Sequence, residues 1–499
     1  MEILGYKKDY QLFNGVDLNK KTKFITPQKN NQSKAKVKQN LNDLFSEIEL
    51  KDGMTLSFHH HLRNGDYVLN FVMQEIARRK VKDITIFASS LFPIHAPLVP
   101  LIENGVVTSI YAAFISGPVA SAISEGKLQK CVIMHTHGGR ARLVESGDVT
   151  IDIAFIASPT CDKLGNITGT IGKSACGSLG YAVTDALYAK TTVALTDNLV
   201  TNLDSYEIDK KYIDYIISVD SIGDSKGIVS GTTQITKNPL GLKIARLTTE
   251  IIKHSGYFKN GFSFQTGAGG ISLAVSYYLK QLMLEEDIKG SFASGGITGY
   301  LVDMLENDLF EKLYDVQCFD LEAVRSIHEN RNHLAISASK YANINDDCIV
   351  NDLDFVILGA TEIDLDFNVN VTTTSTGEIM GGSGGHSDTA AGANVTIVVS
   401  QLFNARIPVI KDKVICKTTP GETIDILVTE RGIAINPLRK DLYERLKETN
   451  LPIKSIAELK AISDNLIGVP EEIKFADKII GVVEYRDGSV IDFLYKKSK

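Results

Sequence analysis

The segment HTHGGRARLVESGD (135–148) combines two arginines with a pair of adjacent glycines. Glycine lets the backbone approach a ligand closely, and an arginine guanidinium can hold a carboxylate through two parallel hydrogen bonds. We therefore interpret Arg140 and Arg142 as candidate ligands for a substrate that carries carboxylates. The same residues would serve equally well in a solvated turn that forms surface ion pairs, and the segment alone leaves both interpretations open.

Histidines dominate a second polar segment, SFHHHLRNGD (57–66). It follows a β-rich run and precedes an amphipathic stretch, which places it at the N-terminus of a helix, where anions are favoured. His59, His60, Arg63 and Asn64 supply donors there and are candidate substrate ligands. Consecutive residues of a strand point to opposite faces, so we predict no metal site. A purely structural turn is the alternative.

Two glycine-rich segments could bind a ligand through backbone N–H groups. SFQTGAGGIS (263–272) has a G-x-G-G pattern between a strand and a helix, without the third glycine of a dinucleotide fingerprint. TGEIMGGSGGHSDTAAGA (376–393) contains so many glycines that the loss of backbone entropy favours a functional loop over a packing role. The candidate substrate ligands in these segments are Thr266, Gly267, Gly384, Gly385 and His386.

The elements that would position these segments recur along the chain. Short β-rich runs alternate with helical periodicity from about residue 46, a pattern typical of parallel βαβ units. Polar residues match at a spacing of 202: Asp152 with Asp354, Asp162 with Asp364, and Asn166 with Asn368. A repeat of this length indicates duplicated domains rather than a solenoid.

We therefore predict an α/β protein of two homologous domains with mainly parallel sheets. The domains span residues 46–230 and 231–499, with the joint between 226 and 243, and a polar, basic arm covers residues 1–45. The facing strand-to-helix loops of two such domains form the expected active-site cleft.

Composition excludes several function classes. The net charge of -7 argues against a general nucleic-acid binder, and no apolar run approaches the length of a membrane span. The N-terminus lacks the layout of a signal peptide. The six cysteines form no C-x-x-C pair and have no histidine at zinc spacing, so we expect free thiols, a cytoplasmic location and no bound metal.

The chain resembles the citrate lyase alpha subunit family from about residue 50 to 440. The resemblance rests on a series of motifs in one order: SFHHH-x-RNGD, HGGR, SP-x-CD-x-x-GN-x-TG, QTGAGG, SFASGGITG, GGSGGHSDTAAGA and TERGIAINP. More distantly, the layout is similar to the CoA-transferase superfamily, which implies two CoA-transferase-like (NagB/RpiA-like) domains. Thioester and carboxylate would meet between them.

The resemblance also implies a reaction and partners. Citrate would displace acetate from an acetyl thioester, giving citryl thioester and acetate. A citrate lyase beta subunit would cleave the citryl thioester, and a gamma subunit, the acyl carrier protein, would carry the acyl group on a CoA-derived arm. The family further implies an oligomer without a permanently bound cofactor, with acetyl-CoA or the carrier's arm as co-substrate.

One departure from the wider superfamily bears on mechanism. Covalent CoA-transferases place a nucleophilic glutamate after the G-x-G-G helix, whereas this chain reads GSFASGGITGY, with no acid between Asp287 and Asp303. The departure implies direct attack by citrate in a ternary complex, through a mixed anhydride. Backbone N–H groups would then stabilise the oxyanion. The catalytic candidates are Gly269, Gly270, Ser294, Gly295 and Gly296.

Three alternatives stay open. The alpha subunit of citramalate lyase would share most of these residues and differ in substrate. A covalent CoA-transferase for another carboxylic acid is disfavoured by the missing glutamate. A non-catalytic ligand sensor would need an output module, and the N-terminal arm is too short and polar for a helix-turn-helix.

Overall fold

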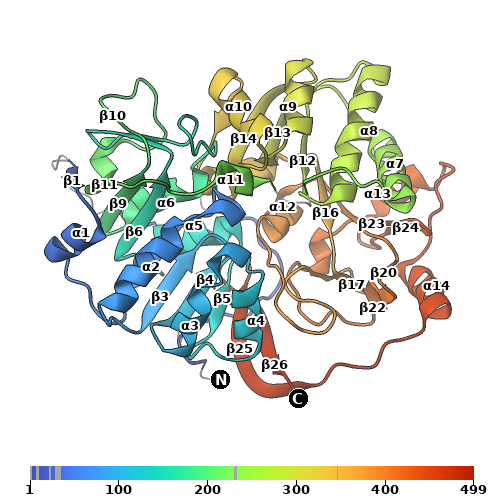
Figure 1. Cartoon of the computed structure of the whole chain (residues 1–499). Helices are drawn as coiled ribbons and strands as arrows, with labels where there is room; N and C mark the ends of the chain where they lie inside the picture. The colour runs from blue at the N-terminus through green and yellow to red at the C-terminus, as the bar shows by residue number, and fades with distance from the viewer. Residues whose placement is uncertain are drawn as a thin grey trace.

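The computed structural model describes residues 3–6, 10–21, 24–27, 35–229, 233–344 and 347–498. This part of the chain forms two α/β halves, each built on one large sheet with helices packed against it (Figure 1). The predicted α/β class with mainly parallel sheets is confirmed. No helix of the described ranges is long and apolar enough to cross a membrane.

The first sheet has ten strands in the order β1-β11-β9-β6-β2-β3-β4-β5-β25-β26, all parallel except for the last pair. The strands are β1 (Lys36–Lys38), β2 (Thr55–Phe58), β3 (Ile84–Ala88), β4 (Val107–Ala112), β5 (Val132–Met134), β6 (Ile153–Ser158), β9 (Thr191–Thr196), β11 (Tyr215–Ser218), β25 (Phe475–Glu484) and β26 (Val490–Lys497). The helices of this half are α1 (Leu41–Glu47), α2 (Val68–Arg78), α3 (Leu98–Glu103), α4 (Pro118–Ser124), α5 (His137–Glu145) and α6 (Gly180–Tyr188).

The second sheet has eight strands in the order β15-β14-β13-β12-β16-β19-β23-β24, and only β23 and β24 pair antiparallel. The strands are β12 (Phe262–Thr266), β13 (Gly290–Ile297), β14 (Phe310–Cys318), β15 (His333–Ala335), β16 (Phe355–Gly359), β19 (Val395–Val399), β23 (Ile426–Thr429) and β24 (Gly432–Ile435). The helices are α7 (Pro239–His254), α8 (Gly270–Glu286), α9 (Gly299–Glu306), α10 (Leu321–Glu329), α11 (Ala338–Ala342), α12 (His386–Gly392), α13 (Lys440–Leu446) and α14 (Ile456–Ile467).

Small sheets decorate each half. They comprise β7 (Thr160–Asp162), β8 (Ile167–Thr168) and β10 (Leu199–Val200); β17 (Glu362–Asp364), β18 (Val369–Asn370) and β22 (Ile410–Lys411); and β20 (Phe403–Asn404) with β21 (Ile407–Pro408). Short 3₁₀ helices are η1 (Arg63–Gly65), η2 (Pro93–His95), η3 (Lys210–Tyr212), η4 (Ser225–Ile228), η5 (Ile349–Asp352) and η6 (Gly421–Thr423).

The residues that repeat in sequence form the same hydrogen bonds in both halves. Asp162 ends β7, the short strand after β6, and its Oδ1 accepts from the backbone N–H of Leu164 and of Asn166, at 2.9 Å each. Asp364 ends β17, the matching short strand after β16, and its Oδ1 accepts from the N–H of Asp366 and Asn368. The carboxylate thus closes the same Asx-type turn twice. The repeat reflects local hydrogen bonding that each half needs on its own.

The C-terminal segment departs from the predicted domain boundaries. We assigned residues 231–499 to the second domain, but β25 and β26 lie in the first sheet, where Gly481 pairs with Val132 of β5. The chain crosses back from α14 to reach them (Figure 1). Without β25, β5 would be an edge strand with unpaired backbone groups, and buried Val482 and Val483 cover it.

The described part of the predicted arm also packs on the first half. Lys36–Lys38 form β1, which pairs parallel with β11, and Leu12 bridges Val490 of β26. Residues 28–34 of the arm and residues 230–232 of the predicted joint lie outside the described ranges. The six cysteines are free and buried.

The buried His61 should make the free energy of unfolding depend on pH. It lies in the turn after β2, is 1% exposed, and burial together with the neighbouring His59 lowers its pKa to about 3. An exposed histidine has a pKa of about 6.5, so His61 contributes its full stability above that pH and loses it as the pH falls toward 3. From about pH 7.5 to about pH 5.5 the loss should reach about 1.4 kcal/mol.

We expect the difference in unfolding free energy between wild type and His61→Asn to shrink by that amount over this range, measured by urea denaturation. A pH-independent difference for His61→Asn would mean that this imidazole is not held neutral.

Candidate active site

A cavity of about 440 Å³ lies between the two halves. It is lined from the first half by residues that follow β2, β3, β4 and β5, and from the second half by residues at the ends of β12, β13, β14 and β16. The carboxyl ends of parallel strands open toward such crevices, so both sheets present their loops to one space. The predicted cleft between the halves is therefore present.

A glycine loop of the second half, residues 381–385, crosses to the first half and forms one wall. The N–H of Gly384 donates to the carbonyl of Ala113 at 3.0 Å, and the N–H of His137 donates back to the carbonyl of Gly384 at 2.8 Å. Gly384 has φ +51°, and a Cβ on Gly382 would lie 2.2 Å from the Ala113 carbonyl oxygen. The loop needs glycine because its backbone packs directly on the other half.

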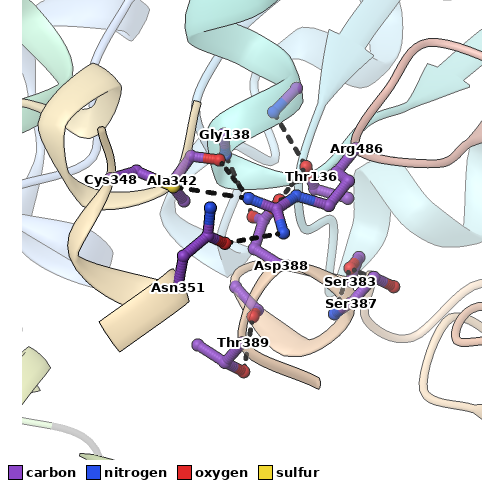
Figure 2. A network of polar contacts seen from close by, with 12 residues as sticks. Thr136, Gly138, Ala342, Cys348, Asn351, Ser383, Ser387, Asp388, Thr389 and Arg486 are labelled. Atoms are coloured by element: carbon purple, nitrogen blue, oxygen red, sulfur yellow. Dashed lines mark hydrogen bonds and ion pairs between the residues drawn. The ribbon is translucent and has the colours of Figure 1, made fainter. Parts of the chain in front are cut away.

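Asp388, the third residue of α12, fixes the contact between the glycine loop and the first half (Figure 2). Its carboxylate accepts from Thr136 Oγ1 at 2.8 Å and from the N–H of Gly138 at 3.0 Å, both at the start of α5. The guanidinium of Arg486 approaches from the β25–β26 turn, with Nε 3.8 Å from Asp388 Oδ1. Arg486 also donates to the carbonyl of Ala342 and to Asn351 Oδ1.

Arg63 is the cation of the cavity. Its guanidinium carbon lies 4.7 Å from the ring centroid of Phe319 and 5.6 Å from that of Phe92, which indicates cation–π contact from both halves. Its Nη1 is buried without a hydrogen-bond partner, and burial lowers the pKa of the guanidinium to about 10. Its backbone has φ +50°, a strained conformation for a residue with a side chain.

The residues that line the cavity include no aspartate or glutamate. Arg63 therefore faces the space without a carboxylate partner from the described part of the chain. A desolvated, unpaired guanidinium is costly, and a strained backbone persists where the site requires it. The first feature favours an anionic ligand, and the second marks the position as a functional one.

The structure places Arg140 and Arg142 elsewhere, which corrects our interpretation of the HGGR segment. Arg140 holds Asp185 of α6 with two hydrogen bonds of 2.7 Å, and its side chain is 1% exposed. Arg142 pairs with Asp148 at 2.8 Å. Neither arginine lines the cavity. Both guanidiniums are used inside the first half because α5 directs them toward its packed side.

The other predicted ligands divide in the same way. His60, Arg63, Thr266, Gly267, Gly384, Gly385 and His386 line the cavity. His59 Nε2 is hydrogen-bonded to Asp185 Oδ2 at 2.8 Å, and Asn64 Oδ1 accepts from the N–H of Ile94. Neither His59 nor Asn64 lines the cavity. His386 contacts Thr419 Oγ1 through Nδ1 and the Gly359 carbonyl through Nε2, so neither ring nitrogen is left for a ligand.

The catalytic candidates fall into two groups. Gly269 and Gly296 line the cavity, whereas Gly270 begins α8 outside it. Ser294 donates to Gln265 Oε1 at 2.9 Å. A Cβ on Gly295 would lie 2.7 Å from the Gln265 amide. Ser294 and Gly295 therefore both contact the side chain of Gln265. Gln265 in turn donates to the Tyr341 hydroxyl at 2.7 Å.

The glycine loop after β12 exposes backbone donors. The N–H of Gly267 donates to the carbonyl of Ile357 at 2.9 Å, while the described residues supply no acceptor for the N–H of Ala268 or Gly269. Gly269 is the N-cap of the long helix α8, whose dipole favours negative charge at this end. An anion or a developing oxyanion fits this position.

Several lining residues escaped the sequence analysis. Ser90, Phe92, His137, Gln317 and Phe319 follow or end a parallel strand and could have been found by testing every strand end. Tyr181 and Tyr341 lie on α6 and α11, and no local sequence signal brings helix residues to the cavity.

Comparisons with known proteins agree on one family. The family model described as "Citrate lyase, alpha subunit (CitF)" matches residues 34–497. The citrate lyase alpha chain of Haemophilus influenzae is 48% identical over 463 residues, covering 92% of this chain and 93% of that protein. The citrate lyase alpha chain of Escherichia coli is 48% identical over 465 residues, covering 92% and 91%.

Solved structures agree with this match. A Streptococcus mutans protein described as the alpha subunit of citrate lyase, solved in complex with citrate, has a TM-score of 0.91 and 44% identity, covering 99% of this chain and 96% of that one. A Pseudomonas malonate decarboxylase hetero-tetramer, solved with malonate, shares the fold with a TM-score of 0.62 and 16% identity over 87% of this chain and 84% of that one. The chain belongs to the citrate lyase alpha subunit family.

Proposed function

We propose that the chain is a citrate CoA-transferase, which exchanges the acyl group of a thioester between acetyl and citryl. A carboxylate oxygen of citrate attacks the acetyl thioester carbon, the C–S bond breaks, and the thiolate leaves beside a bound mixed anhydride. The thiolate then attacks the citryl carbonyl and acetate departs. Family membership and the citrate complex of the Streptococcus mutans relative support this substrate.

The single observation that carries the proposal is Arg63, which has no carboxylate partner among the described residues and faces a cavity whose lining lacks carboxylates. A carboxylate of citrate would give the Arg63 guanidinium the charge-assisted hydrogen bonds that no described residue gives it. Thr266, Gly267, Gly384 and Gly385 line the same space and would complete the citrate pocket. The N–H of Gly269, for which the described residues supply no acceptor, would be an oxyanion donor.

The absence of an acid from the cavity lining also supports the ternary mechanism over a covalent one. A glutamyl-enzyme route needs a carboxylate within bonding reach of the thioester carbon. The segment from Gly290 to Thr298, where the superfamily places that glutamate, contributes Gly296 to the cavity. Citrate itself is the carboxylate nucleophile in this proposal, and it is ionised at neutral pH.

The co-substrate in this proposal is the CoA-derived arm of a small acyl carrier protein, the gamma subunit, and acetyl-CoA can replace it. A beta subunit cleaves the citryl thioester in a separate active site of an oligomeric complex. We propose no permanently bound cofactor for this chain. The family membership supports these partners through the complex that its name implies.

Removal of the Arg63 charge should weaken citrate binding. Loss of one charge-assisted pair costs roughly 1.5–3 kcal/mol, which corresponds to about 10- to 150-fold in Kd. We expect Arg63→Ala to show this loss in isothermal titration with citrate, and Arg63→Lys to show a smaller one because the charge remains without the planar fork. Arg78→Ala on the exposed face of α2 is the matched control. Wild-type citrate affinity in Arg63→Ala would remove Arg63 from the site.

Transfer should need both substrates at once. The purified chain with acetyl-CoA and citrate should produce citryl-CoA and acetate with sequential kinetics and without oxaloacetate. With acetyl-CoA alone, borohydride should trap no reduced glutamate on the chain, as read by mass spectrometry of its peptides. A trapped glutamate would establish the covalent mechanism instead, and citramalate in place of citrate tests the substrate.

A further inference from the structure

His60 lies in the same wall of the cavity as Arg63, and its ring is held by neighbours on several sides. The ring centroid lies 4.7 Å from that of Tyr181 and 5.9 Å from that of His137, with the two imidazoles nearly parallel at 15°. The carbonyl of His60 accepts from Gln317 Nε2 at 2.9 Å and from the N–H of Arg63 at 2.8 Å. The imidazole therefore has a fixed plane and a fixed position.

Ser89, which directly follows β3, fixes the proton on this ring. Ser89 Oγ accepts from the backbone N–H of His60 at 3.0 Å and lies 2.5 Å from His60 Nδ1. Ser89 is fully buried, and within the described ranges its hydroxyl has no other hydrogen-bond partner. Among the described residues Nδ1 is the acceptor within reach of the Ser89 proton, and a buried hydroxyl that donated to nothing would be costly. This favours the tautomer with Nδ1 as acceptor and the ring proton on Nε2.

The Nε2–H is the part of the ring left for a ligand, because Nδ1 is turned to Ser89 and the residue lines the cavity. The ring is also neutral. Burial, followed by the neighbouring His137 and Arg63, holds the pKa of His60 well below its usual range. A neutral imidazole N–H can donate a hydrogen bond to a developing oxyanion and, as a very weak acid, keeps its proton.

From this geometry we infer that His60 is a catalytic residue whose Nε2–H donates to the thioester oxygen as negative charge develops on it, and that Ser89 is the positioning residue that selects this tautomer. The inference rests on the proposed function. In the step concerned, the citrate oxygen bonds to the thioester carbon, the carbonyl π electrons move to oxygen, and that oxygen accepts from Nε2–H. Collapse re-forms the carbonyl and expels the thiolate, and no proton is exchanged.

The first measurement concerns the tautomer and is independent of activity. The full chain is labelled with ¹⁵N-histidine, and the His60 ring signals are identified by their loss in His60→Gln. We expect one protonated nitrogen, Nε2, and one acceptor, Nδ1, at neutral pH. Ser89→Ala should populate both tautomers. A protonated Nδ1 or an imidazolium in the wild-type chain would overturn the inference.

The second measurement compares turnover from acetyl-CoA to citrate in His60→Phe, His60→Gln and Ser89→Ala. Loss of one oxyanion donor should lower kcat of His60→Phe about 100- to 1000-fold with an unchanged Kd for citrate. His60→Gln should be faster than His60→Phe because its amide can donate, and Ser89→Ala should lose kcat to a smaller extent. His254→Gln, on the exposed end of α7, should match the wild type.

The outcomes separate the two claims. A wild-type chain that binds no citrate and transfers nothing would overturn the proposed function, whatever the tautomer. A wild-type chain that transfers while His60→Phe turns over at the wild-type rate would overturn only the role of His60. If His60→Phe does not fold, as judged by circular dichroism, equal kcat in His60→Gln, Ser89→Ala and wild type would have the same consequence.

Discussion

The Asp388 carboxylate is the interaction on which the rest of the site depends. Three segments distant in sequence meet there: the start of α5 through Thr136 and Gly138, the start of α12, and Arg486 of the C-terminal hairpin (Figure 2). Burial raises the pKa of Asp388 to about 6, and the N–H of Gly138 and Arg486 act in the opposite direction. A buried charge is tolerable only with such partners, so this contact fixes the relative position of the halves.

The same device recurs in the first half, where Arg140 holds Asp185 of α6. Asp185 and Asp388 lie 203 residues apart, one more than the spacing of the repeat, and each anchors a helix next to the cavity through a buried arginine. The arginine itself comes from a different place in each case: α5 for Asp185, and the added β25–β26 turn for Asp388. The return of the C-terminal strands to the first sheet therefore supplies a structural partner that the duplicated unit lacks.

These pairings explain which features the sequence could reveal. Turn carboxylates such as Asp162 and Asp364 act on neighbouring N–H groups, so their spacing predicts both the repeat and the strand ends. Arg140 was misassigned because its partner lies 45 residues away in sequence, and a guanidinium suits a substrate carboxylate and an aspartate equally. Residues 475–497 were assigned to the second domain because they follow it in sequence, and no local signal tells to which sheet a terminal strand adds. Arg63 became the strongest candidate only once its lack of a partner could be seen.

The distribution of charge around the cavity has a consequence for reactivity. The segments 57–66 and 135–148 contain three arginines. Arg140 and Arg142 pair with aspartates inside the fold, and Arg63 lines the cavity. A carboxylate nucleophile bound by several cations would be stabilised in its ground state, and that stabilisation would add to the barrier for attack. One guanidinium with neutral donors from Gly269 and His60 instead leaves much of the available hydrogen bonding for the charge that appears on the thioester oxygen. A cavity poor in fixed charge is therefore suited to a reaction in which the substrate supplies the nucleophile.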